Sequence, residues 1–399
     1  MAPVARHGPV TLHSIEGHDR LREAVVRAVS NSELAKVLLL HGPRGVGKQR
    51  LALWIGQLLL CESESQERPC GECRGCRASL RLEHPDLLWY FPIKRPPSKS
   101  SAARDQEAYE QVRSDVLAQR RARPLMASHT DEPLGLHLGT VRNLKREAAR
   151  GATLASRRMF VLGEAQELVS QEASPEAANA LLKLLEEPPE SCWFVLTSSE
   201  PGRLLPTIRS RTVGLHTPPI SDGQVMDFLS EHTDASSDEA ERAARLCSGS
   251  IGRALGFLPD DGELGPLERI RQEAFHLLRS ALASQATDRF GAALAYSPAG
   301  ARGLHELLTS LETWIRDLAV LASAAGTPLL NPDASTWLSR TVADRSIDPR
   351  LAAECVQHVE ESRNLAARNI NPQLILTRLL FRIRAGLQGP QSLATDETP

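Results

Sequence analysis

Short apolar runs alternate with segments of helical period along the first half of the chain. Each run has the length of a buried strand, and the segments between them repeat their apolar residues every three or four positions, as amphipathic helices do. Strands that alternate with helices give a parallel α/β sheet. We therefore predict an α/β domain with a five-stranded parallel sheet, with strands at 36–40, 84–91, 157–162, 192–198 and 212–216.

The pattern changes after Pro218 and Pro219. Short helical segments follow one another from 221 to 257, and nearly every segment from 266 to 387 has helical period, with few strand signals. These shifts predict an α/β domain, a small helical domain, an all-helical domain and a polar tail. Their predicted limits are 1–217, 218–260, 265–388 and 389–399.

Glycines interrupt the chain between the first predicted strand and the helix after it, in the stretch HGPRGVGK at 41–48. Gly42, Gly45 and Gly47 would let successive backbone N–H groups turn toward an anion, and the helix N-terminus adds roughly half a positive charge. Lys48 would reach the outer phosphates. The order of strand, glycine loop, lysine and helix predicts a nucleotide-phosphate site. The alternative is a glycine turn before a buried helix.

Two positions depart from the pattern that handles Mg²⁺. The residue after the lysine is Gln49 instead of Ser or Thr, and an amide oxygen is a weaker ligand for a hard cation than a hydroxyl. The third strand normally ends in Asp-Glu, which hold Mg²⁺ and polarise the attacking water, but here it ends in Gly163 and Glu164. Thr197 ends the fourth strand, where such sheets face ligands. We expect a site that can bind ATP without hydrolysing it, with Glu164 vestigial.

Four of the seven cysteines gather after the loop helix. Cys70, Cys73 and Cys76 form two C-x-x-C steps, and Cys61 lies a short way upstream. Four thiolates at this spacing complete the tetrahedral coordination of Zn²⁺ and leave no open position. We predict a structural zinc module over 61–76. An iron–sulfur cluster, a redox pair and free surface thiols are the alternatives, and the other three cysteines are expected to be small buried residues.

Composition limits which binding partners and which cellular location we expect for the chain. The 399 residues carry a formal net charge of −2, so no global field attracts nucleic acid or membrane. No apolar run reaches the length of a membrane span, and residues 1–20 lack the apolar core of a signal peptide. We expect a cytoplasmic protein. Segment 94–133, which carries prolines, a Ser/Lys run and many charges, is expected to be a surface insertion, part helix and part mobile.

Two long motifs carry a family likeness: ANALLKLLEEPP at 178–189 and LLPTIRSR at 204–211. With the cysteine module, they closely resemble the clamp-loader subunits of bacterial replicative DNA polymerase III. The likeness covers nearly the whole chain except the insertion. It implies an AAA+ α/β domain, a helical lid and an all-α collar for oligomerisation. Because Gln49 and Gly163 depart from the pattern of the ATP-hydrolysing gamma/tau motor subunit, the chain resembles the delta-prime type.

The resemblance also implies roles for individual residues. Arg211, in Ser210-Arg211-Thr212, matches an arginine that projects into the ATP site of the neighbouring subunit, and Arg253 matches the lid arginine that senses nucleotide. Arg142 and Lys145 lie on the polar side of a predicted helix that tracks DNA in related loaders. The implied partners are the gamma/tau and delta subunits, the sliding clamp and primer-template DNA.

Other interpretations stay open at this point. The chain can be an active ATPase of the same architecture, with Glu164 catalytic, or a zinc-dependent adaptor that binds no nucleotide. Arg211 can be a local salt bridge that holds its turn, and Arg142 and Lys145 can belong to a solvated helix face. We expect no intrinsic ATPase activity from the chain, which the resemblance makes part of a DNA polymerase III holoenzyme.

Overall fold

The computed structural model describes residues 11–65, 67–97, 102–125, 134–168, 176–260, 262–296, 300–366 and 370–388. These residues divide into two compact units. The first contains the described residues up to Asp234 together with Cys247–Leu255, and the second contains Ala235–Leu246 and the described residues from Gly256 onward. The domain limits expected from the sequence stay predictions.

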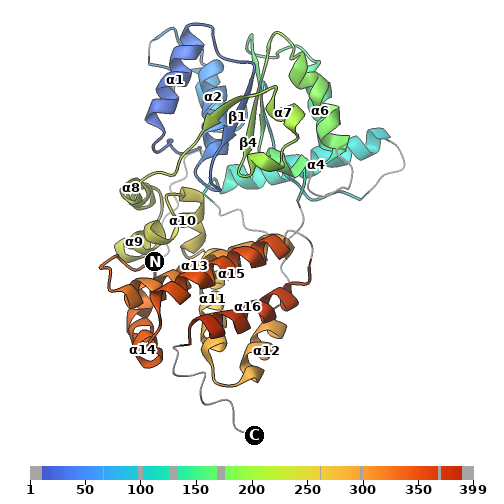
Figure 1. The fold of residues 1–399 in the computed structure, drawn as a ribbon. Coiled ribbons are helices and arrows are strands. Elements are labelled where there is room, and N and C mark those ends of the chain that lie inside the picture. The colour runs from blue at the N-terminus through green and yellow to red at the C-terminus, as the bar shows by residue number, and fades with distance from the viewer. Residues whose placement is uncertain are drawn as a thin grey trace. The chain divides into compact units, whose positions relative to one another are not determined.

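A five-stranded sheet forms the centre of the first unit (Figure 1). The strand order is β2-β3-β4-β1-β5, and every neighbouring pair is parallel. Central strands of such a sheet are buried on both faces, which explains why they are continuous apolar runs in the sequence. The predicted parallel α/β class is confirmed. The strands are β1 (Val37–His41), β2 (Leu87–Tyr90), β3 (Arg158–Leu162), β4 (Cys192–Ser198) and β5 (Val213–His216).

Helices cover both faces of the sheet (Figure 1). Leu38 and Leu40 of β1 pack with the helices of one face, and Val37 and Leu39 pack with those of the other, because successive side chains of a strand point to opposite faces. The first face carries α1 (Asp19–Ser30) and α2 (Lys48–Leu59), and the second carries α5 (Leu138–Ala148), α6 (Glu176–Glu186) and α7 (Pro206–Arg209).

The predicted insertion contains a long helix, α4 (Ala102–Ala122), that is docked on the first unit. Tyr109 is buried in the same core as α2, and Val112 and Val116 pack against that core. Asn143 of α5 also donates a hydrogen bond to the Gln106 carbonyl oxygen, at 3.1 Å. The helical part of the predicted insertion is therefore α4, while 98–101 and 126–133 lie outside the described residues.

Shorter elements complete the first unit. The elements are α3 (Arg74–Leu80), η1 (Ala165–Leu168), η2 (Pro201–Arg203) and α8 (Asp222–His232), and α10 (Ile251–Phe257) begins in this unit. α8 begins with a capping box in which Ser221 and Gln224 satisfy each other's backbone N–H groups, an arrangement that fixes the start of a helix.

Throughout the described part of the chain, each helix is too short or too polar to cross a lipid bilayer.

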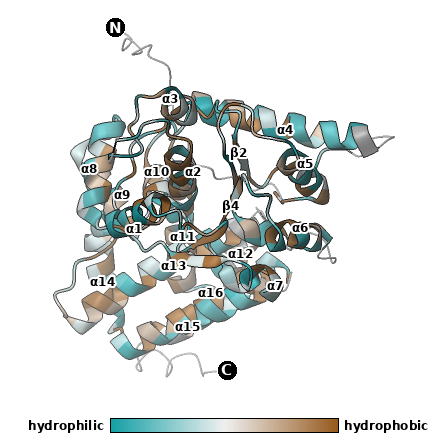
Figure 2. Cartoon of the chain, turned by 90° about the horizontal axis from the view of Figure 1, so that it is seen from above, coloured by the Kyte–Doolittle hydropathy of each residue, from teal (hydrophilic) through white to brown (hydrophobic). Residues whose placement is uncertain are grey.

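The second unit is helical in its described residues, as the sequence predicted for this region. Its helices turn their apolar faces inward (Figure 2) and enclose a core around the fully buried Trp314. The indole N–H of Trp314 donates to the carbonyl oxygen of Arg271, whose guanidinium pairs with buried Glu268. The elements are α9 (Ser237–Leu246), α11 (Pro266–Leu282), α12 (Ala286–Ala295), α13 (Gly300–Ser323), η3 (Pro332–Ala334), α14 (Ser335–Arg345), α15 (Pro349–Ala366) and α16 (Pro372–Gly386).

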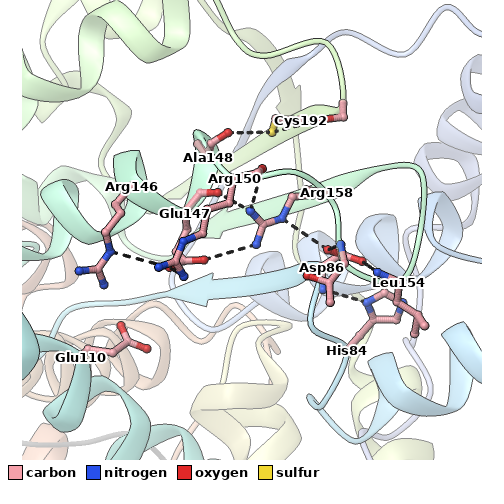
Figure 3. Close-up of polar contacts among 12 residues, drawn as sticks. His84, Asp86, Glu110, Arg146, Glu147, Ala148, Arg150, Leu154, Arg158 and Cys192 are labelled. Carbon is pink, nitrogen blue, oxygen red and sulfur yellow. Dashed lines mark hydrogen bonds and ion pairs between the residues drawn. The ribbon is translucent and has the colours of Figure 1, made fainter.

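A buried charge network fixes the start of β3 (Figure 3). Arg158 lies 3.5 Å from Asp86 and 3.5 Å from Glu147, which is near the end of α5. Asp86 also accepts hydrogen bonds from the backbone N–H groups at 153–155, at 2.7–2.9 Å. Burial raises the pKa of Asp86, but these backbone hydrogen bonds outweigh it, so the pKa lies below its usual value. The network ties α5, β2 and β3 together.

Replacing this carboxylate should destabilise the fold in a pH-dependent way. Asp86→Asn should lower the free energy of unfolding at pH 7 by about 1.5–3 kcal/mol, because hydrogen bonds to a charged group are lost. A carboxylate with a depressed folded-state pKa stabilises above its unfolded pKa and loses this effect as pH falls through the folded value. The difference from wild type should therefore shrink below about pH 4, as measured by urea unfolding at pH 7 and pH 3.

An exposed aspartate provides the control. Asp227→Asn, on the surface of α8, should change the free energy of unfolding by less than about 0.5 kcal/mol at either pH. A deficit for Asp86→Asn that stayed the same at pH 3 would show that the charge of Asp86 is not its source.

Candidate functional site: the glycine loop and the cysteine cluster

The glycine loop has the conformation that its sequence predicts. It leaves β1 after His41, and Gly45 and Gly47 adopt φ angles of 79° and 95°, a region that favours glycine. A Cβ atom at Gly45 would overlap the Ser250 hydroxyl. The backbone carbonyl of Gly45 accepts a hydrogen bond from the Gly252 N–H at 3.0 Å. Gly47 is the N-cap of α2, so the helix N-terminus faces the loop.

Lys48 is folded over this loop. Its Nζ donates to the carbonyl oxygens of Gly42 and Pro43, at 2.9 and 2.7 Å, and to the Ser199 hydroxyl at 3.0 Å. Burial lowers the pKa of Lys48 to about 8, although Glu164 acts in the opposite direction. In the structure the ammonium group therefore satisfies the loop's own carbonyls, in the region where a phosphate would be held.

Glu164 and Thr197 meet at the carboxyl ends of β3 and β4. Glu164 has a φ of 52°, and its backbone N–H donates to the Thr197 hydroxyl at 3.0 Å. Its carboxylate accepts hydrogen bonds from Gln166 at 2.6 Å and from Ser199 at 3.4 Å. Ser199 thereby links this carboxylate to Lys48. The structure thus brings together three of the residues that the sequence singled out.

The two positions that depart from the magnesium pattern touch each other. A Cβ atom at Gly163 would overlap the amide oxygen of Gln49 and lie 2.7 Å from its Cδ. The same amide oxygen accepts a hydrogen bond from the Trp89 indole at 3.1 Å. Any side chain at 163 would have to displace this amide, so the two changes form one packing unit. Sequence reasoning missed Trp89, which carried no signal beyond its place in an apolar strand.

The segment that contains Arg253 also lies against the loop. The Ser250 hydroxyl donates to the Arg44 carbonyl oxygen at 2.9 Å, and a Cβ atom at Gly45 would lie 3.5 Å from Arg253 Cγ. Arg253 is therefore next to the loop, as the resemblance implied, whereas its role stays a prediction.

Arg211 lies apart from the loop and is held by its own chain. It forms an ion pair with Glu186, the last residue of α6, and donates to the Thr207 carbonyl oxygen at 2.7 Å. The Arg211 side chain is 31% exposed to solvent. Arg142 and Lys145 are exposed on α5. The structure tests neither the trans role of Arg211 nor contacts of α5 with DNA.

The four clustered cysteines converge as their spacing predicted. The sulfur atoms of Cys61, Cys70, Cys73 and Cys76 all lie within 4.8 Å of one another. Three of the sulfur pairs are 3.7–4.0 Å apart, which fits the roughly 3.8 Å between sulfurs that bind one tetrahedral Zn²⁺. Backbone N–H groups of Cys73 and Glu72 lower the pKa of Cys70 to about 6, which favours a thiolate. The cluster can hold a structural metal.

Comparison with known proteins gives the family. The profile described as "DNA polymerase III, delta subunit" matches residues 17–221. The chain belongs to this family. It is 27% identical to the DNA polymerase III subunit delta' of Escherichia coli strain K12 over 88% of this chain and 89% of the relative, and 30% identical to that of Pseudomonas aeruginosa over 54% of this chain and 53% of the relative.

The same comparison finds similarity to a second subunit type. The DNA polymerase III subunit gamma/tau of Mycobacterium bovis is 26% identical over 53% of this chain and 29% of its own length. The match to delta' in Escherichia coli extends over most of both chains. The family and these relatives confirm a clamp-loader subunit of the delta-prime type.

The contact between Gln49 and Gly163 can be tested by a double-mutant cycle. Gly163→Ala should lower the free energy of unfolding by about 1–3 kcal/mol, because it overpacks the site. Adding Gln49→Ala should recover part of this loss, with a coupling of at least about 0.5 kcal/mol, as measured by urea unfolding. Gly151→Ala, where a Cβ meets nothing within 4 Å, is the control. Strictly additive effects would contradict the contact.

Proposed function

We propose that the chain is a delta-prime-like, largely non-hydrolysing subunit of the DNA polymerase III clamp loader. It acts as a structural platform, supplies Arg211 to the ATP site of a neighbouring gamma/tau motor subunit, and helps to load the sliding clamp onto primed DNA. The observation that carries the proposal is the Gln49 amide packed on Gly163 and bonded to Trp89. It stands where a hydrolytic site needs a hydroxyl and a carboxylate for Mg²⁺.

The rest of the loop supports a site that does not turn over. Lys48 is bonded to two loop carbonyls, and the Glu164 carboxylate is engaged by Gln166 and Ser199. These two hydrogen bonds hold the Glu164 carboxylate in place within its own chain. ATP can bind such a loop, but we expect no hydrolysis. Arg253 and Thr197 would then contact nucleotide without contributing to turnover.

The partial exposure of Arg211 supports a role outside its own chain. Its ion pair with Glu186 is partly exposed, and exposed pairs contribute only about 0–1 kcal/mol. A planar guanidinium can donate two hydrogen bonds to γ-phosphate oxygens. Exchanging Glu186 for a phosphate is therefore energetically accessible. The gamma/tau and delta subunits are the proposed partners, and the exposed cations Arg142 and Lys145 the proposed contacts with primer-template DNA.

A second candidate function is an active gamma/tau-like motor subunit. The similarity to gamma/tau relatives favours it, and Glu164 is present as a possible catalytic group. Single-turnover hydrolysis by the purified chain distinguishes the two. Hydrolysis that Lys48→Ala abolishes would favour the motor subunit and contradict the platform.

Removing the Arg211 guanidinium should slow ATP hydrolysis by the neighbouring subunit without changing the fold of this chain. Arg211→Ala should assemble with gamma/tau and delta, yet lower DNA-stimulated hydrolysis at the adjoining motor site by at least about tenfold, since arginines supplied in trans contribute roughly 10³–10⁵ in GTPases. Size exclusion and single-turnover hydrolysis by the assembled complex measure both effects. Arg203→Ala, another partly exposed arginine paired with a glutamate, should behave as wild type. If the complex with Arg211→Ala kept full hydrolysis while the variant chain lost thermal stability, Arg211 would have a structural role within its own chain only.

We propose that the cysteine cluster holds one structural Zn²⁺, because four sulfurs complete its coordination and leave no place for substrate. Since metal binding in such a site contributes to folding, Cys73→Ala should lose the metal in elemental analysis and unfold at lower temperature. Cys247→Ala, outside the cluster, should keep one zinc per chain. Full zinc occupancy in Cys73→Ala would contradict this ligand set.

A further inference from the structure

The insertion helix α4 brings one arginine to the edge of the glycine-loop site. The Arg120 guanidinium lies over two aromatic rings, 4.5 Å from the centroid of Trp89 and 4.0 Å from that of Phe91. Trp89 is the residue whose indole N–H donates to Gln49. The Arg120 guanidinium is therefore stacked on Trp89, the side chain that fixes the Gln49 amide by a hydrogen bond.

The position of Arg120 is fixed by its neighbours on α4. Arg113 donates to the Trp89 carbonyl oxygen at 3.1 Å and pairs with Glu110. Arg121 donates to the Leu82 carbonyl oxygen. These bonds on either side of Arg120 join the carboxyl-terminal half of α4 to β2 and to the turn before it. Arg120 thus approaches the site from a rigid element, which is how a binding group is held in place.

The charge of Glu164 also acts on Arg120. Burial lowers its pKa to about 10, and Glu164 acts to raise it, so the guanidinium is protonated at neutral pH. Glu164 exerts the same effect on Lys48. Among the residues that the structure describes, none accepts a hydrogen bond or ion pair from Arg120. The Glu164 charge thus acts on both cations, and Arg120 keeps its hydrogen-bond donors for a ligand.

We propose that Arg120 takes the part of Mg²⁺ in this site, so that the loop binds metal-free nucleoside triphosphate through Lys48 and Arg120. A nucleotide phosphate carries more charge than one lysine neutralises, and Mg²⁺ normally supplies the remainder. Here the metal position holds a neutral amide that is already bonded to Trp89. A guanidinium offers the compensating charge together with paired donors for phosphate oxygens.

This inference rests on the proposed function in one respect, that the loop holds nucleotide without hydrolysing it. The stacking of Arg120 suits the role, because cation–π contact leaves the edge of the guanidinium, where its donors point, available to a ligand. An incoming phosphate would become the anion that Lys48 and Arg120 share. The insertion helix α4 would then be part of the nucleotide site.

Equilibrium binding of a fluorescent ATP analogue to the full chain tests the proposal, once with excess EDTA and once with excess MgCl₂. The wild-type chain should bind in EDTA at least as tightly as in MgCl₂. Arg120→Gln should weaken binding in EDTA by roughly tenfold or more, the effect of one charged hydrogen-bonding group. Arg120→Lys should recover part of this loss, since it keeps the charge without the paired donors.

Arg104→Gln is the matched control, because it removes the same charge from an exposed position of α4, about 24 Å away along the helix axis. It should bind as the wild type does. Thermal denaturation checks that Arg120→Gln is folded, and the comparison of EDTA with MgCl₂ on wild type tests the inference even if that variant is unstable.

Three results would overturn the inference: binding that requires Mg²⁺, equal binding by Arg120→Gln and wild type, and no nucleotide binding in either condition. None of these alters the assembly of the chain with gamma/tau and delta or the effect of Arg211→Ala there. Failure of the inference is therefore distinguishable from failure of the platform function.

Discussion

The packing of the Gln49 amide on Gly163 is the constraint on which the rest of the site depends. The two residues come from the first turn of α2 and the end of β3, and the parallel sheet sets their separation. Because Gly163 has no side chain, the amide can lie against its backbone, and Trp89 fixes the amide by a hydrogen bond. The space that a metal and its carboxylate ligand would need is filled by protein.

The charges around this contact are arranged accordingly. A site that binds Mg²⁺ separates its lysine from its acid by the metal and the phosphates. Here Lys48 lies on loop carbonyls and is joined to Glu164 through Ser199. These groups satisfy one another, so the loop keeps its shape through contacts within the chain. This arrangement is consistent with the proposed non-hydrolysing role, in which the fold does not depend on the stage of a nucleotide cycle.

The features that the sequence could predict are those encoded over short distances. The glycine loop is specified by residues within one turn, and the cysteine cluster by two C-x-x-C steps with one more thiol close upstream. The five strands are apolar runs of the expected length. Even the altered positions were visible, because Gln49 and Gly163 each follow a recognisable motif. What the sequence could not show was that they touch, because they are more than 100 residues apart.

The docking of the insertion helix on the core could not be predicted from the sequence, for a physical reason. Its helix buries only a narrow stripe around Tyr109, Val112 and Val116, and its many charges give it the composition of a solvated arm. Arg113 and Arg120 are charged and so add nothing to the apolar pattern of the helix. They nevertheless anchor it, Arg113 by a hydrogen bond to a backbone carbonyl and Arg120 by stacking on aromatic rings. Long cationic side chains can pack in this way because their stems and planar faces are compatible with apolar surroundings.

The contacts of Arg211 bear on its proposed role at the ATP site of a neighbouring subunit. In the isolated chain its guanidinium is bound to Glu186 and to a carbonyl oxygen of its own turn, which pre-orders a long side chain before any partner arrives. Ordering such a side chain costs up to about 2 kcal/mol of conformational entropy, and this cost is met during folding. The bond that must then break is a partly exposed ion pair of low strength. Glu186 can therefore hold the arginine in place and still release it to a phosphate, whose greater negative charge attracts the guanidinium more strongly.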